Sequence, residues 1–198
     1  NTQQWGSKRQ GNVPDGFSEL IFDTQQGTYF RSFTYDSKFT EDSDLKLDTD
    51  ETRRLRGYVH RIINSEEFKS TNSELGQFIV ITNAGDGGMN VVAERLNKMD
   101  KWDGYPVFMH ASFPMALHVA YNENVEIIRN NVDEFYEQLY RTLNGGNLYQ
   151  TEQDDVEFYV SLSDEDVEGL MDNFSANISD SGLQIDDLRE FLESDIFP

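Results

Sequence analysis

Apolar residues recur with two different periods along the chain, and these periods predict where helices and strands lie. Residues 50–69 place Leu55, Val59 and further apolar side chains at steps of three and four residues, the pattern of an amphipathic helix. Residues 124–143 repeat that pattern most regularly, and Gly145 stands where a helix C-cap is expected. Both segments are therefore predicted to be helices that bury one face.

Shorter segments show the apolar runs or the alternation that predict strands. Residues 17–22 and 28–35 are rich in aromatic and β-branched side chains on either side of a short polar turn, so we expect a hairpin. Further strands are predicted at 78–82, 105–111, 115–121 and 156–162, and further helices at 89–99, 163–174 and 185–193. The resulting order, β-β-α-β-α-β-β-α-β-α-α, predicts an α+β or α/β fold in which amphipathic helices pack on a mixed β-sheet.

The chain of 198 residues is expected to form one domain with two distinctive ends. Residues 1–16 are polar and lack either period, so they are predicted to be an extended arm with Trp5 as its one large apolar group. Residues 17–149 form the predicted α/β body. Residues 150–198 form an acidic β-α-α appendage, which we expect to be part of the same domain.

The chain carries 37 acids against 16 bases, a net charge of −21, and the excess is unevenly distributed. Residues 148–198 alone hold 15 acids and a single base, Arg189. Two interpretations of this region remain open: a solvated face that favours solubility, or a surface that meets a basic partner. Because nucleic acid and anionic lipid are both negatively charged, a net charge of −21 argues against them as partners, and we expect no direct nucleic-acid binding and no membrane binding.

The densest basic cluster in the sequence consists of Arg53, Arg54, Arg56 and Arg61, all within the predicted helix 50–69. These arginines either pair with the protein's own acids or dock the acidic tail of a neighbouring copy. In the second case the uneven charge would serve assembly.

The two ends of the chain supply further candidate partner contacts. Trp5 lies in the polar arm, and Ile196 and Phe197 follow several acids at the C-terminus. The last six residues resemble the short acidic tails with which some single-strand-binding proteins recruit partners. The alternative is that the terminal apolar pair packs on the body of the protein.

The strongest enzyme-like signal is a glycine-rich loop, Gly85, Asp86, Gly87 and Gly88, between the predicted strand 78–82 and the following helix. Backbone amides in such a loop can bind an anion, so these four residues are candidate ligand-binding residues. The loop lacks the Lys-Ser/Thr of a P-loop, and its spacing is not G-x-G-x-x-G. The glycines therefore also fit a simple turn, and Asp86 fits a helix cap.

Histidine is the only other residue type that suggests a metal or catalytic site. His110 and His118 lie on the predicted strands 105–111 and 115–121, which makes them candidate metal ligands as cross-strand neighbours. Two imidazoles without a third ligand do not form a catalytic zinc pattern. The chain has no cysteine, so thiolate sites and disulfides are excluded, and no cofactor is expected.

Together these features favour a non-enzymatic acidic protein that acts through protein–protein contacts or self-association, as a structural or accessory subunit of a larger assembly. The Asn-rich composition suggests a phage or viral source. One alternative is an acidic inhibitor that mimics nucleic acid on a basic partner, and another is a small enzyme or ligand-binding protein that uses the loop 83–88. No signal peptide or transmembrane segment is visible, which favours a soluble protein of the cytoplasm or the virion.

Overall fold

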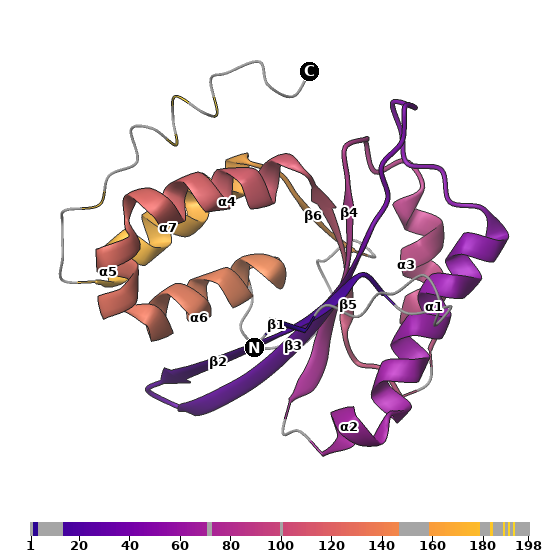
Figure 1. The fold of residues 1–198 in the computed structure, drawn as a ribbon, viewed down its shortest axis with the longest axis horizontal. Helices are drawn as coiled ribbons and strands as arrows, with labels where there is room; N and C mark the ends of the chain where they lie inside the picture. Colours follow the sequence, from indigo (N-terminus) through magenta and orange to yellow (C-terminus); the bar gives the residue numbers. More distant parts are fainter. Residues whose placement is uncertain are drawn as a thin grey trace.

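The computed structural model describes residues 2–3, 14–70, 73–99, 101–146 and 159–178, together with positions 183, 188, 190 and 192. Within this part of the chain, helices cover both faces of one mixed β-sheet (Figure 1). The fold class predicted from the sequence is therefore confirmed.

The sheet follows the order of the chain, β1-β2-β3-β4-β5-β6. Its strands are β1 (Thr2–Gln3), β2 (Gly16–Thr24), β3 (Gly27–Ser37), β4 (Glu74–Thr82), β5 (Tyr105–His110) and β6 (Val160–Leu162). The predicted hairpin is present as the antiparallel pair β2 and β3. Gly27 at the start of β3 has a φ of 137°, a backbone conformation that residues with a side chain rarely adopt. From β3 to β6 each strand is parallel to the next. The start of the N-terminal arm adds β1, which pairs antiparallel with β2.

Two layers of helices bury two apolar clusters against the sheet (Figure 1). The first layer contains α1 (Thr49–Asn64), α2 (Glu66–Lys69) and α3 (Met89–Asn97). The second layer contains α4 (Ser112–Glu123), α5 (Val125–Asn130), α6 (Val132–Leu143) and α7 (Glu165–Asn177). Alternate residues of β4 divide between the clusters: Phe78 and Val80 face α1 and α3, whereas Ile79 faces the second layer. β6 and α7 thus share the sheet and the second core with the body of the chain.

Specific residues cap helix α1 at both of its ends. Asp48 accepts a hydrogen bond from the Glu51 backbone N–H at 2.7 Å, and the Glu51 side chain accepts one from the Asp48 N–H, which forms a capping box. Ser65 ends the helix, and its extended backbone separates α1 from the short α2. The predicted helix 50–69 is therefore present as two helices.

The helices that follow β4 and β5 lie on opposite faces of the sheet. The connections after β3 and β4 carry α1 and α3 on one face, whereas α4, α5 and α6, which follow β5, pack on the other. The chain therefore leaves the carboxyl ends of β4 and β5 toward opposite faces, and we call this place the switch point. Open α/β sheets usually bind ligands in a crevice outside the carboxyl ends of their strands.

The segment 115–121, predicted to be a strand, is part of helix α4. Its apolar residues suggest alternation, but the buried positions are Phe113, Ala116 and Ala120, which follow helical spacing. Met115 and Tyr121 are instead exposed. Helical packing of two small alanines has overridden the alternating pattern.

Other differences concern element boundaries. The predicted helix 124–143 is divided into α5 and α6 at Asn131, where φ is −132° and ψ is 41° and the side-chain amide donates to the Ile127 carbonyl at 2.9 Å. Of the predicted helix 185–193 the structure describes Leu188, Glu190 and Leu192, all three in helical conformation, and the segment 147–158 lies outside the described residues. No helix in the described ranges combines the length and apolarity needed to cross a bilayer.

Candidate functional site

The glycine-rich loop at the switch point is covered by the chain itself. The segment before α1 runs alongside the loop: the Gly85 N–H donates to the Ser43 carbonyl, and the Leu45 N–H donates to the Gly85 carbonyl, both at 2.8 Å. These two bonds form a parallel bridge between Asp44 and Gly85. The amide of Gly85, which an anion would need, is therefore already in use.

Close backbone contact explains why glycine occupies these positions. A Cβ added at Gly88 would lie 2.2 Å from the Leu45 carbonyl oxygen, and one added at Gly85 would lie 2.8 Å from the Asp44 carboxylate. At Gly87 the nearest atom would be the Asp44 Cβ at 3.3 Å. The three glycines thus allow the segment 43–45 to lie close against the loop. The ligand-binding role of Gly85, Asp86, Gly87 and Gly88 stays a prediction.

Asp86 also has a partner within the protein. Its carboxylate accepts a hydrogen bond from the Tyr159 hydroxyl at 2.7 Å, and its carbonyl accepts one from the Met89 N–H at 2.8 Å. Tyr159 immediately precedes β6, so this contact connects the loop after β4 to the sheet edge. On the neighbouring strand, the Ala111 N–H donates to the Thr82 carbonyl at 2.7 Å, which joins the two strand ends at the switch point.

A cluster of His110, Ser112 and Asp164 lies at the carboxyl ends of β5 and β6. The Ser112 hydroxyl donates to the Asp164 carboxylate at 2.7 Å and lies 2.8 Å from His110 Nδ1. Although these residue types form hydrolase triads, Ser112 is only 1% exposed and lies between the other two side chains. A nucleophile must reach its substrate, so the cluster acts as a staple between β5 and the start of α7.

His118 does not lie on a strand beside His110. It lies within α4, where its Nε2 is 2.9 Å from the Asn122 side-chain amide. The cross-strand pairing assumed for a metal site is therefore wrong. In the ranges that the structure describes, no group of three or more His, Asp or Glu side chains is arranged to hold a metal ion.

Asp36 is a buried carboxylate at the end of β3. Its side chain is 4% exposed and forms an ion pair with Lys38. Burial raises the pKa of Asp36 above its usual value, and the hydrogen bond and charge of Lys38 oppose that rise. The chain continues from this pair into the segment that covers the glycine-rich loop, and the start of that segment is held by hydrogen bonds between Thr40 and the Asn83 side chain at 3.0 Å and 2.9 Å.

The four arginines predicted as partner contacts lie on the outer surface of α1. All four, Arg53, Arg54, Arg56 and Arg61, are exposed. Arg53 pairs with Asp50 of the same helix at 2.8 Å, and no ion pair of Arg56 is present in the described part of the chain. Gly57 lies among them, and nothing is found within 4 Å of a Cβ added there. We call these four arginines and Gly57 the α1 face. The other candidate contacts, Trp5, Ile196 and Phe197, lie outside the described residues.

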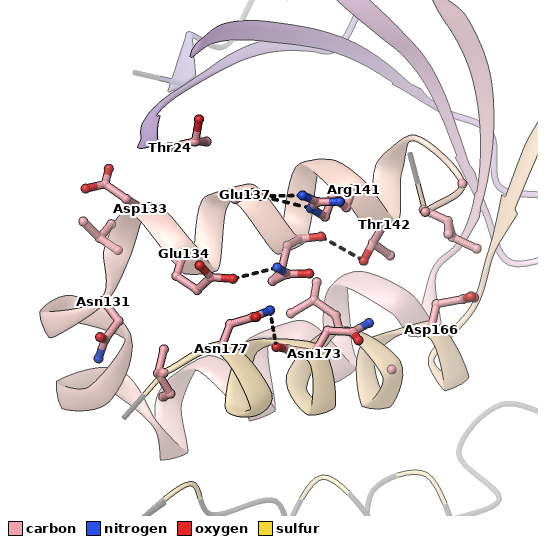
Figure 2. A pocket seen from close by; sticks show the side chains of 18 of the residues that line it. Thr24, Asn131, Asp133, Glu134, Glu137, Arg141, Thr142, Asp166, Asn173 and Asn177 are labelled. Carbon is pink, nitrogen blue, oxygen red and sulfur yellow. Dashed lines mark hydrogen bonds and ion pairs between the residues drawn. The ribbon is translucent and has the colours of Figure 1, made fainter. Parts of the chain in front are cut away.

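On the opposite side of the sheet, a groove of about 1680 Å³ lies between α6 and α7 (Figure 2). The turn between β2 and β3 borders one end, and β6 borders the other. The apolar part of the lining consists of Val132, Val160, Leu162, Leu170 and Ile178. Because Val132 is 40% exposed, apolar surface reaches the rim of the groove as well as its floor.

The charged part of the groove lining is strongly acidic. Six carboxylates contribute to it, against one base, Arg141: Asp23, Asp133, Glu134, Glu137, Glu165 and Asp166. Arg141 is already paired, since its Nη2 and Nε lie 2.6 Å and 3.1 Å from the Glu137 carboxylate. The other five carboxylates have no cationic partner among the described residues, and their contacts are to neutral groups. The groove therefore presents uncompensated negative charge.

Gly169 lies at the middle of the α7 wall of the groove. It occupies the same helix stripe as Glu165 and Asn173, which both line the groove, and nothing is found within 4 Å of a Cβ added at Gly169. A glycine inside a helix destabilises it by about 1 kcal/mol relative to alanine. No contact within the described structure offsets that cost or requires a glycine at this position.

Comparison with known proteins adds no family to this description. The chain matches no protein-family model, no curated protein and no solved structure. The chemistry of the site therefore has to be inferred from its geometry and charge.

Proposed function

We propose that this chain acts through protein–protein contacts, and that the groove between α6 and α7 receives a cationic, helical segment of a protein partner. The observation that carries the proposal is an open groove with an apolar floor and five carboxylates that no described cation neutralises. Such a surface complements a helix with apolar residues on one side and Lys or Arg at its margins.

The size of the groove supports a protein segment over a small molecule. Small-molecule pockets usually enclose roughly 300–1,000 Å³, and this groove, at about 1680 Å³, is larger. Its α7 wall runs from Glu165 to Asn177, which corresponds to about 18 Å at the rise of an α-helix. A partner helix of three to four turns would fill that length.

Because Gly169 has no side chain, the backbone of a partner helix could approach α7 closely at this position. Close approach brings the carboxylates on both walls within reach of the same helix, with Glu134 on α6 and Glu165 on α7. The attraction acts over a short range at physiological salt, so binding should weaken as ionic strength rises.

The direct test is binding of a fluorescein-labelled amphipathic helical peptide with Leu on one face and Arg at its margins, followed by anisotropy. Glu134→Gln with Glu165→Gln should weaken binding about fivefold or more, because two carboxylates facing the peptide are removed. Gly169→Gln should weaken it more than tenfold by filling the α7 wall.

The matched control is Asp172→Asn, which removes a carboxylate from α7 outside the groove lining. Its affinity should equal that of the unaltered protein. Equal losses at Asp172 and Glu165 would mean that the peptide responds only to overall charge, and the groove would no longer be the proposed site.

A further inference from the structure

The chain carries its own candidate for the cationic helix. The α1 face presents four exposed arginines along a helix of 16 residues, and these supply the positive charge that the carboxylates of the groove call for. Building on the function proposed above, we propose that the α1 face of a second copy occupies the groove between α6 and α7.

Charge complementarity is the first support for this pairing. The chain has a net charge of −21, and yet α1 concentrates arginine on its outer surface. Asp50 pairs with Arg53 on this face, whereas Arg56 has no ion pair among the described residues. The groove offers five carboxylates without cations, so each surface supplies the charge that the other lacks.

The second support is the matching position of two glycines. Gly57 lies within the α1 face and Gly169 at the centre of the α7 wall, and a Cβ at either position would meet nothing within 4 Å. A glycine at the middle of a helix lowers the intrinsic stability of that helix. In neither helix does a contact among the described residues of one copy require the glycine. If α1 lies against α7, both glycines are explained, since small residues allow two helix backbones to approach closely.

The positions of the two surfaces determine the kind of assembly. α1 lies in one helix layer and the groove in the other, on opposite sides of the sheet (Figure 1). A copy that inserts its α1 face into one neighbour leaves its own groove open to another. The contact is therefore head-to-tail, and repetition gives a ring if it closes and a filament if it does not.

Salt should affect this assembly in two ways. Each copy carries a net charge of −21, so copies repel one another at very low ionic strength. At about 0.15 M salt the screening length is about 8 Å, which suppresses that long-range repulsion while leaving contacting charges attracted. Association should thus be strongest at intermediate salt and weaken again at high salt.

The test uses two full-length variants that each lose one of the two surfaces. Arg53→Glu with Arg56→Glu removes the α1 face and retains the groove, whereas Glu165→Lys with Gly169→Gln removes the groove and retains the α1 face. Sedimentation velocity should show that the unaltered protein gains mass with concentration and that each variant alone is a monomer. An equimolar mixture should form a dimer with one copy of each variant and nothing larger.

The control is Lys46→Glu with Lys98→Glu, which changes the net charge equally at exposed positions away from α1 and should leave assembly intact. A monomeric unaltered protein at every salt and protein concentration would overturn the self-docking proposal, as would a mixture that stays monomeric. The Arg53/Arg56 variant keeps its groove, so its binding of the labelled peptide separates the two proposals: binding without self-association leaves the groove function standing, and loss of both removes both.

Discussion

The loop after β4 and the groove between α6 and α7 both combine glycine with carboxylates, and the structure treats them differently. At the loop, a Cβ on Gly88 would lie 2.2 Å from a backbone carbonyl oxygen, whereas a Cβ on Gly169 in the groove would meet nothing within 4 Å. The Asp86 carboxylate in the loop accepts a hydrogen bond from the Tyr159 hydroxyl, whereas Glu165 in the groove has no hydrogen-bond or ion-pair partner among the described residues.

This difference distinguishes two reasons why a glycine or an acid occupies a position: contacts within the chain, or contacts with another molecule. In the loop, glycine and acid satisfy contacts within the chain, so substitutions there should affect the free energy of unfolding. In the groove, Gly169 has open space around it and Glu165 has no hydrogen bond or ion pair among the described residues, so substitutions at these two positions should affect binding and leave folding intact or improved. Each prediction below compares the two regions on one of these quantities.

The largest effect on stability is expected from Gly88→Ala in the loop. Gly88 has φ of −95° and ψ of −10°, a conformation that alanine adopts freely, so any loss must come from the contact with Leu45. Because that neighbour is backbone, the segment 43–45 must move, and we expect a loss of about 3 kcal/mol. Urea denaturation followed by circular dichroism measures it.

The control for this substitution is Gly57→Ala, at a helix position with open space around it. If Gly88→Ala is as stable as the unaltered protein, the segment 43–45 does not hold the loop closed. The glycine-rich loop would then return as a candidate ligand site.

Much of the fold could be predicted from the sequence, because periodic apolar residues report burial directly. Leu55, Val59 and Ile62 are all buried on α1, and the apolar run 78–82 is the central strand β4. The prediction was wrong at 115–121, where the buried residues are small alanines and two larger apolar side chains are exposed. Hydrophobicity alone does not show which face of such a segment packs.

The groove could not be predicted, because its residues come from segments far apart in the chain. Asp23 near the end of β2 and Asp133 on α6 are separated by 110 positions, and the Asp23 N–H donates to the Asp133 carboxylate at 3.2 Å. Single acids on exposed helix faces are common in a chain with 37 of them, so no local pattern marks the ones that converge. The one available signal was Gly169, a glycine within an otherwise regular amphipathic helix.

An intermediate loss of stability, which depends on pH, is expected for Lys38→Met. Lys38 lies at the same edge of the sheet as the glycine-rich loop. Lys38 lowers the pKa of Asp36, which burial raises above the ordinary value of 3.8. Without Lys38 a buried carboxylate is left without its cation, and we expect a loss of about 2 kcal/mol at neutral pH.

The sign of the pH dependence follows from which state of Asp36 holds its proton more tightly. With a raised pKa, the folded protein binds the proton more tightly than the unfolded chain, so Asp36 favours folding at low pH and disfavours it as pH rises. Lys38→Met raises the folded pKa further. The loss of stability should therefore be absent at low pH, where Asp36 is protonated in both folded proteins, and should grow as pH rises through the folded-state pKa of Asp36 until the carboxyl is also ionised in the variant. Thermal unfolding at a series of pH values would show this. A loss that is the same at every pH would mean that Lys38 acts through packing alone.

The smallest effect on stability, with the opposite sign, is expected for Gly169→Ala in the groove. Gly169 lies inside α7 and has no neighbour within 4 Å of an added Cβ, so alanine should raise the free energy of unfolding by about 1 kcal/mol. The same methyl group would hold the backbone of a docked helix away from α7, so binding of the labelled cationic peptide should fall severalfold. Asp172→Ala on α7, which is not part of the groove lining, provides the comparison: stability should also rise there and peptide binding should not change. A gain in stability at Gly169 without any loss of binding would show that the partner does not approach α7 closely, and the glycine would lose its proposed role.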